Sequence, residues 1–157
     1  MNITAPMEIG ICVGDLPRMM AFYEGLLGFR KISELVLNDH GARMSGLGEH
    51  GYTVVRLQTG YGERVKLVCP AQAPPEFPSS ATPTSRRGFG YLTFLVSGLE
   101  ELIARLGAAG SASSRGIVEL RPGVRLALVQ DPEGNWIEFA EYADIYSYRP
   151  DLKRPAD

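Results

Sequence analysis

Cysteine, histidine and long apolar runs are all scarce in this chain of 157 residues. The two cysteines are too few for a disulfide framework, and they form no CxxC motif for zinc or redox chemistry. No apolar run approaches the roughly 20 residues that cross a bilayer. The first residues also lack the charged start and apolar stretch of a secretory signal. We therefore expect a cytoplasmic protein with no membrane partner.

Positive charge is not concentrated anywhere along the chain. Lys and Arg number 16 against 18 Asp and Glu, which gives a formal net charge of −2. Nucleic acids are bound through clusters of Lys and Arg that neutralise phosphates, so we expect no nucleic-acid partner. With 45% hydrophobic and 22% charged residues, the composition favours a packed core and argues against disorder.

The first half of the chain has the pattern of one strand, one helix and three more strands. Apolar residues alternate over residues 7–13, and a helical stripe then runs to Gly28, a residue typical of a helix end. Further alternating runs predict strands at 30–37, 52–59 and 63–69. The polar, glycine-rich insertion 38–51 carries His40 and His50, and we interpret it as a surface loop over the fold.

The second half repeats this order. Strands are predicted at 91–96, 116–120, 124–130 and 136–141. A helix follows the first of them, and Ser97 with Glu100 fits a capping box at its start. The alignment that places Val96 on Val13 also places Tyr91 on Glu8, and the last strands align with Glu138 on Lys66. The chain thus contains two βαβββ modules.

The expected organisation is a single domain, residues 1–157, made of these two modules. The first module covers residues 7–69 and the second covers 89–141. A Pro-rich linker, 70–88, joins them, and a C-terminal tail, 142–157, follows the last strand.

Two segments resemble signatures of the vicinal oxygen chelate superfamily, which includes glyoxalase I, bleomycin-resistance proteins and extradiol dioxygenases. One is VGDLP at 13–17, followed by AFY at 21–23 and LLGF at 26–29; the other is DPEGNWIE at 131–138. The resemblance covers residues 7–141 and implies an α+β fold. In that fold the mixed sheets of two tandem modules curl into a shared cup, with the helices on the outer face. Members commonly form dimers, so a homodimer is expected.

The resemblance also locates the expected site. Members typically bind a divalent metal through one residue from the first strand and one from the last strand of each module. These positions fall here on Glu8, Lys66, Tyr91 and Glu138. Strand alternation independently turns all four side chains away from the helix-covered face.

The chemistry of this set argues against a metal or other cofactor. A protonated lysine has no lone pair to donate, and a neutral tyrosine is a poor ligand for divalent ions. If a metal did bind, Glu8 and Glu138 would be its ligands. We instead expect Lys66 to lie between these two carboxylates and to supply the positive charge itself.

Two functions are consistent with these residues, and both imply a small-molecule partner. The first is a metal-independent isomerase or lyase, in which Glu8 or Glu138 abstracts a proton beside a carbonyl group. Lys66 would then stabilise the enolate, and Tyr91 would donate a hydrogen bond. Extradiol dioxygenase chemistry is not expected, because its iron needs two imidazoles on cup strands.

The alternative is a non-catalytic binding or resistance protein of the bleomycin-resistance type, which holds a drug or metabolite. Several further side chains share the predicted cup-facing phase and are candidate substrate-binding residues. They are Cys12, Tyr52, Arg56 and Trp136.

Overall fold

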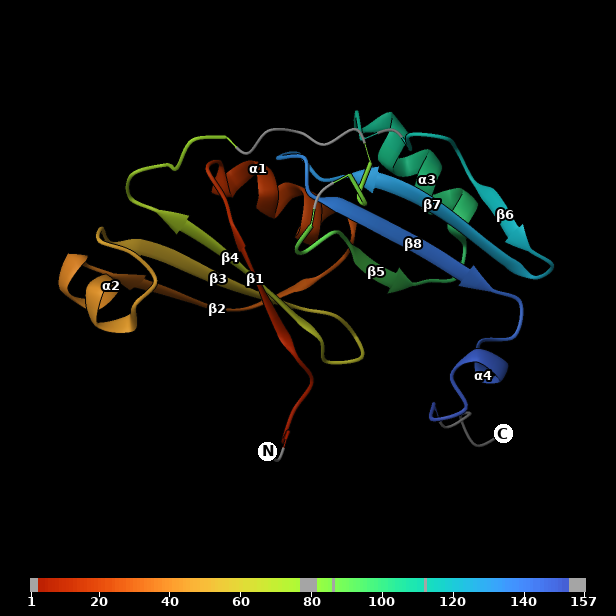
Figure 1. Cartoon of the computed structure of the whole chain (residues 1–157), viewed down its shortest axis with the longest axis horizontal. Coiled ribbons are helices and arrows are strands. Elements are labelled where there is room, and N and C mark those ends of the chain that lie inside the picture. Colours follow the sequence, from red (N-terminus) through yellow and green to blue (C-terminus); the bar gives the residue numbers. More distant parts are fainter. Residues whose placement is uncertain (1–2, 77–81, 86, 112, 153–157) are drawn as a thin grey trace. The chain divides into compact units, whose positions relative to one another are not determined.

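The computed structural model describes residues 3–76, 82–85, 87–111 and 113–152, in two compact units, Met1–Pro78 and Ser79–Asp157 (Figure 1). Each unit contains a four-stranded mixed sheet with helices, and neither sheet is closed. The α+β class and the two βαβββ modules are therefore confirmed. The shared cup and the single domain stay predictions.

The first unit follows the predicted order, with one added helix. Its elements are β1 (Glu8–Cys12), α1 (Leu16–Met20) with its π-helical continuation η1 (Ala21–Leu26), β2 (Arg30–Leu37), α2 (Asp39–Ser45), β3 (Tyr52–Gln58) and β4 (Arg64–Pro70). The sheet order is β1-β4-β3-β2, and only the β1–β4 pair is parallel. The carboxylate of Asp15 accepts a hydrogen bond from the Arg18 amide at 3.0 Å, which caps α1.

Burial distinguishes the two faces of this sheet. On one face, Val65 and Leu67 of β4 are buried, and β4 is also the strand that α1 contacts. We call this the helix face and the opposite one the open face, and we use both terms for each sheet. Because successive side chains of a strand point to opposite faces, Arg64, Lys66 and Val68 lie on the open face.

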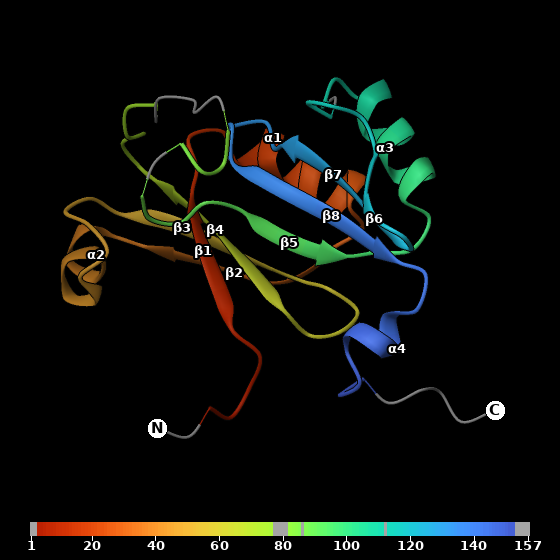
Figure 2. The ribbon, with the colours of Figure 1, turned by 45° about the vertical axis from the view of Figure 1, so that its right-hand side comes forward.

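The second unit repeats the arrangement (Figure 2). Its elements are β5 (Leu92–Leu95), α3 (Leu99–Ala108), β6 (Val118–Arg121), β7 (Val124–Gln130), β8 (Trp136–Tyr142) and α4 (Ile145–Tyr148). The order β5-β8-β7-β6 again has one parallel pair, β5–β8. The turn before β8 is built around the buried carboxylate of Asp131, which accepts hydrogen bonds from the amides of Glu133 at 3.0 Å and Asn135 at 2.9 Å.

The internal repeat extends to individual hydrogen bonds. Val13 donates its amide to the carbonyl of Val68 at 2.9 Å, and Val96 donates to the carbonyl of Ala140 at the same distance. In the parallel pairs, Gly10 lies opposite Lys66 as Thr93 lies opposite Glu138. The alignment of Lys66 with Glu138 is therefore also an equivalence of place in the sheet.

The predicted capping box at α3 is wrong. The N-cap residue is Gly98, in the left-handed conformation at φ 71°, and it provides no side-chain cap. The capping side chain comes instead from a strand, β8. The Glu141 carboxylate of β8 accepts hydrogen bonds from the amides of Gly98 at 2.6 Å and Leu99 at 3.3 Å. Glu100 instead forms an ion pair with Arg125, which also pairs with Glu141. The carboxylate of Glu141, which is distant in sequence, thus caps α3 in place of the Ser97 side chain that the local spacing predicted.

The insertion 38–51 also differs from the prediction, because it contains the helix α2. Asn38 caps it by accepting a hydrogen bond from the Gly41 amide at 2.9 Å, and Gly46, at φ 72°, ends it. Ala42 is fully buried in a cluster with Tyr52 and Val54 of the open face. The helix therefore covers one end of that face.

Parts of the predicted linker and tail lie outside the described residues. These parts are 77–81 and 86 of the linker and 153–157 of the tail. The described part of the tail includes α4, which contacts β8. None of the helices in the described part of the chain has the length and apolar character needed to cross a bilayer.

The Glu141→Gln variant tests the cap of α3. We expect a loss of about 1–2 kcal/mol in unfolding free energy at pH 7, because a charged acceptor of two helix amides becomes neutral. Hydrogen bonding to Arg125 lowers the pKa of both Glu141 and Glu100. A lowered folded-state pKa gives stability that is present above the ordinary carboxyl range and is lost as the pH falls through the lowered value. Denaturant melts at pH 7 and pH 3 should therefore show the difference between wild type and variant shrinking in acid.

Candidate functional site

The open face of the first sheet carries a cluster of opposite charges at β1 and β4. Glu8 accepts a hydrogen bond from Nη1 of Arg64 at 3.0 Å, and Nζ of Lys66 lies 3.8 Å from the other oxygen of Glu8. About a third of each of the three side chains is exposed, 31% for Glu8, 37% for Arg64 and 33% for Lys66. The expected ion pair between Lys66 and Glu8 is present. The position of Lys66 relative to Glu138 stays a prediction.

A third cation joins the cluster from β3. Arg56 is the register partner of Lys66, and its Nη1 donates to the hydroxyl of Ser33 at 3.3 Å. Arg64 also donates from Nε to the amide oxygen of Gln58 at 2.7 Å. Arg64 and Lys66 of β4 therefore flank the carboxylate of Glu8, and Arg56 lies beside Lys66 on the next strand. This excess of positive charge, partly shielded from water, favours an anionic or oxygen-rich ligand.

Space for a ligand exists beside this cluster. Gly10 is the register partner of Lys66, and a Cβ atom built on it would meet no atom within 4 Å. Cys12, the next open-face residue of β1, is exposed. The charged side chains thus lie beside open space at Gly10, and we call Gly10 with the exposed Cys12 the strip along β1.

Tyr52 has a different environment from the one expected. It is only 7% exposed, it packs with Ala42 and Val54, and its hydroxyl lies 3.0 Å from that of Ser45. These contacts anchor α2 to the sheet. Tyr52 therefore packs α2 against the sheet, and its contact with a ligand stays a prediction.

The open face of the second sheet carries Glu138, Trp136 and Tyr91. The carboxylate of Glu138 accepts a hydrogen bond from the hydroxyl of Thr93 at 2.8 Å. Within the described residues of its own unit, no Lys or Arg forms an ion pair with it. Tyr91 directly precedes β5 and is 43% exposed, whereas Trp136 is the first residue of β8 and pairs with Gln130 of β7.

Arg64 belongs to the site but was not predicted from the sequence. The sequence could have indicated Arg64, because Arg64 and Lys66 are two residues apart on one strand and therefore lie on the same face. The alternation of apolar and polar residues does not predict the register of β1 against β4, which places Arg64 directly opposite Glu8. The register makes Arg64 the nearer ion-pair partner.

The donor set does not fit a divalent metal. Glu8 is held by two cations, and the protonated amine of Lys66 has no lone pair to donate to a metal ion. Within the described residues of either unit, no three His, Cys, Asp or Glu side chains gather as metal ligands do. The side chains of this cluster therefore suit an anionic ligand better than a cation.

Comparison with known proteins gives a family and a fold. The model of the Glyoxalase/Bleomycin resistance protein/Dioxygenase superfamily matches residues 6–139. No curated protein matches the chain.

Several solved structures share the fold at low sequence identity. A glyoxalase family protein from Bacillus cereus has a TM-score of 0.78 at 23% identity, over 91% of this chain and 97% of that one. A glyoxylase/bleomycin resistance protein/dioxygenase domain from Frankia sp. EAN1pec has a TM-score of 0.68 at 18% identity, over 90% and 93%. A glyoxalase I mutant from Zea mays has a TM-score of 0.69 at 19% identity, over 89% of this chain and 45% of that one.

Proposed function

Because the chain belongs to the Glyoxalase/Bleomycin resistance protein/Dioxygenase superfamily, we propose that it acts on a small organic molecule with an anionic or carbonyl oxygen. The proposed reaction is an isomerase or lyase reaction that needs no metal or other cofactor and passes through an enolate-like intermediate. The observation that carries the proposal is the charge cluster on the open face of the first sheet, where Arg64 and Lys66 flank Glu8 and Arg56 lies beside Lys66 on the next strand.

Lys66 is the residue proposed to stabilise the negative charge of the enolate. Its ammonium group bears a positive charge on the face where metal-binding members carry a ligand, and it borders the open space at Gly10. A hydrogen bond from a fixed cation to a carbonyl oxygen becomes stronger as negative charge develops there. Arg56 and Arg64 supply further positive charge for a carboxylate of the same molecule.

Glu138 is the proposed base. Its carboxylate accepts a hydrogen bond from the neutral Thr93, whereas that of Glu8 is shared between two cations. A carboxylate that is not shared between two cations is the better proton acceptor. Tyr91 is the proposed hydrogen-bond donor. This division of roles depends on the shared cup, which stays a prediction.

The second candidate function is binding without turnover. It is favoured by Tyr91 and Trp136, two aromatic side chains at the starts of neighbouring strands, which suit a flat ligand. Small carbonyl acids and planar aromatics should be screened for product formation and for saturable binding. Product formation supports the enzyme. Tight, stoichiometric binding with no product after long incubation supports the binding protein instead.

The Gly10→Val variant tests whether the ligand uses the strip along β1. A branched side chain there points into empty space, so folding should not suffer, and replacing a strand glycine should stabilise by up to about 1 kcal/mol. We expect kcat/KM, or affinity for a non-reacting ligand, to fall at least about tenfold, a difference of 1.4 kcal/mol. The matched control is Gly25→Ala, also without a neighbour within 4 Å but on η1. Wild-type activity in Gly10→Val would exclude the strip from the site.

The expected homodimer and cytoplasmic location also stay predictions.

A further inference from the structure

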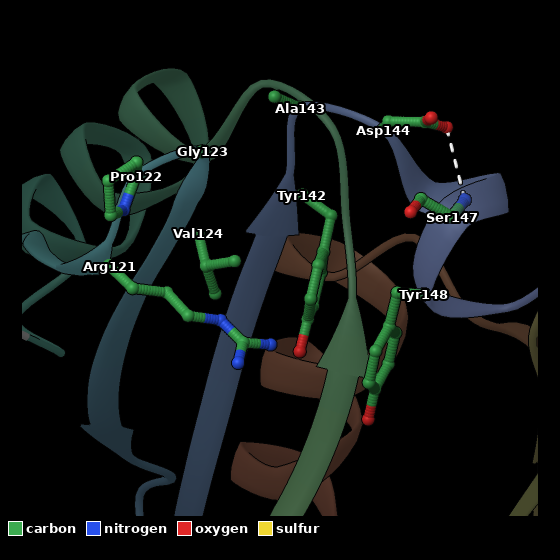
Figure 3. Close-up of a pocket in the computed structure, with 9 residues that line it drawn as sticks. All are labelled: Arg121, Pro122, Gly123, Val124, Tyr142, Ala143, Asp144, Ser147 and Tyr148. Atoms are coloured by element: carbon green, nitrogen blue, oxygen red, sulfur yellow. Dashed lines mark hydrogen bonds between the residues drawn. The ribbon is translucent and has the colours of Figure 1, made fainter.

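A cavity of about 390 Å³ opens on the second unit, where β8 leads into α4 (Figure 3). Its walls are the turn between β6 and β7, the end of β8 and the helix α4. Sites for small molecules typically enclose roughly 300–1,000 Å³, so the cavity has room for a compact ligand. None of the residues that line it takes part in the proposed isomerase or lyase reaction.

One wall is a pair of stacked tyrosines. The rings of Tyr142 and Tyr148 have centroids 4.2 Å apart and planes inclined by 11° (Figure 3). Tyr142 lies on the open face of β8, and Tyr148 comes from α4. Tyr148 is 49% exposed and backs one face of Tyr142, and Figure 3 shows Arg121 on the other side of Tyr142, so the Tyr142 end of the pair is the one turned toward the cation. Flat aromatic surface of this kind binds another planar ring by stacking.

The opposite wall supplies a positive charge. Figure 3 shows the Arg121 side chain extending below Val124 toward the hydroxyl end of Tyr142. Among the described residues, no carboxylate forms an ion pair with Arg121. Asp144 also lines the cavity, but its carboxylate accepts hydrogen bonds from the amides of Tyr146 and Ser147 at the start of α4. Arg121 is therefore the positively charged group of the cavity that is available to an anionic ligand.

The rim of the cavity is held in place before any ligand binds. Pro122 and Gly123 form the turn, and Gly123 takes the φ of 75° that suits glycine. The carbonyl of Gly123 accepts a hydrogen bond from the Ala143 amide at 2.8 Å, which ties the turn to the end of β8. A preformed site loses less conformational entropy on binding than a mobile one.

We propose that this cavity binds a small planar aromatic carboxylate, whose ring stacks on the Tyr142–Tyr148 pair and whose carboxylate pairs with Arg121. A guanidinium forms two parallel hydrogen bonds with a carboxylate, which fixes the orientation of the ring. Burial raises the pKa of Tyr142, and its hydrogen bond with Tyr148 acts in the same direction. The phenol therefore stays neutral near pH 7 and does not repel the anion.

Benzoate is the probe, titrated into the ¹⁵N-labelled full chain and followed by amide chemical shifts. We expect saturable shifts at Arg121, Gly123, Val124 and residues 142–148, since Pro122 has no amide proton. Two probes of similar size separate the contributions: benzamide lacks the charge, and cyclohexanecarboxylate lacks the aromatic ring. Each should bind about tenfold more weakly than benzoate, a difference of 1.4 kcal/mol.

Arg121→Gln and Tyr148→Ser should each weaken benzoate binding at least about tenfold by the same measure. Arg115→Gln, an exposed arginine of the same unit outside the cavity, is the matched control and should bind as wild type does. Binding by Arg121→Gln with wild-type affinity would overturn the proposal, and so would the absence of saturable shifts. Shifts confined to Arg56, Arg64 and Lys66 would also overturn it, but would support an anion site on the first unit.

Discussion

Glu138→Gln is expected to lower kcat by about 10²–10⁴-fold, the range that a positioned general base contributes. Glutamine keeps the size of the side chain and a carbonyl oxygen that can accept the Thr93 hydrogen bond, but it cannot take up a proton. The melting temperature should therefore stay nearly unchanged. The assay is steady-state turnover of the substrate found by screening, beside a thermal melt of each variant.

The matched variant is Glu8→Gln. We expect a smaller loss of kcat from it, together with a rise in KM, because Glu8 mainly positions Arg64 and Lys66. If Glu8→Gln abolishes turnover while Glu138→Gln leaves it intact, Glu8 is the base. If Glu138→Gln is markedly more stable and fully active, the carboxylate has only a structural role and the proposed mechanism is wrong.

Lys66→Met should lower kcat/KM by about 10²–10³-fold, the range measured when one donor to a developing oxyanion is removed. Methionine retains the length and apolar stem of lysine but lacks its charge. Arg64 still pairs with Glu8 at 3.0 Å in this variant, so the carboxylate is not left without a partner. The fold should therefore be little affected, and kcat/KM and the melting temperature are the two measurements.

Lys31→Met is the control for loss of a lysine. Lys31 is 42% exposed and pairs with Glu34 on β2, so its replacement should leave kcat/KM unchanged. Metal content and melts with Ni²⁺, Mn²⁺, Zn²⁺ and Fe²⁺ belong to the same experiment. Near-stoichiometric metal, or a metal-dependent rise in melting temperature of wild type, would contradict the role given to Lys66.

The locally coded features were predictable from sequence. Asp15 as a helix cap, Gly28 after the first helix, and the turn around Asp131 each depend on residues within a few positions of one another. Strand alternation is equally local, and it assigned Lys66 and Glu138 to the face opposite Val65 and Ile137, which are buried.

Features that depend on distant residues were missed or mistaken. The cap of α3 comes from Glu141, which lies 43 residues after Gly98, so the local spacing of Ser97 and Glu100 led to a wrong prediction. The helix α2 has little apolar periodicity of its own. It is stabilised by one small residue, Ala42, buried against the sheet.

The residues available on each open face could be predicted from the amino-acid sequence, because side chains alternate along a strand with a period of two. Which of these residues meet depends on how the strands pair and how the helices dock. The register of β1 on β4 set Arg64 opposite Glu8 and Lys66 opposite Gly10, and the docking of α4 stacked Tyr148 on Tyr142. Register and docking are set by the packing of the whole sheet, and no short segment of sequence contains that information.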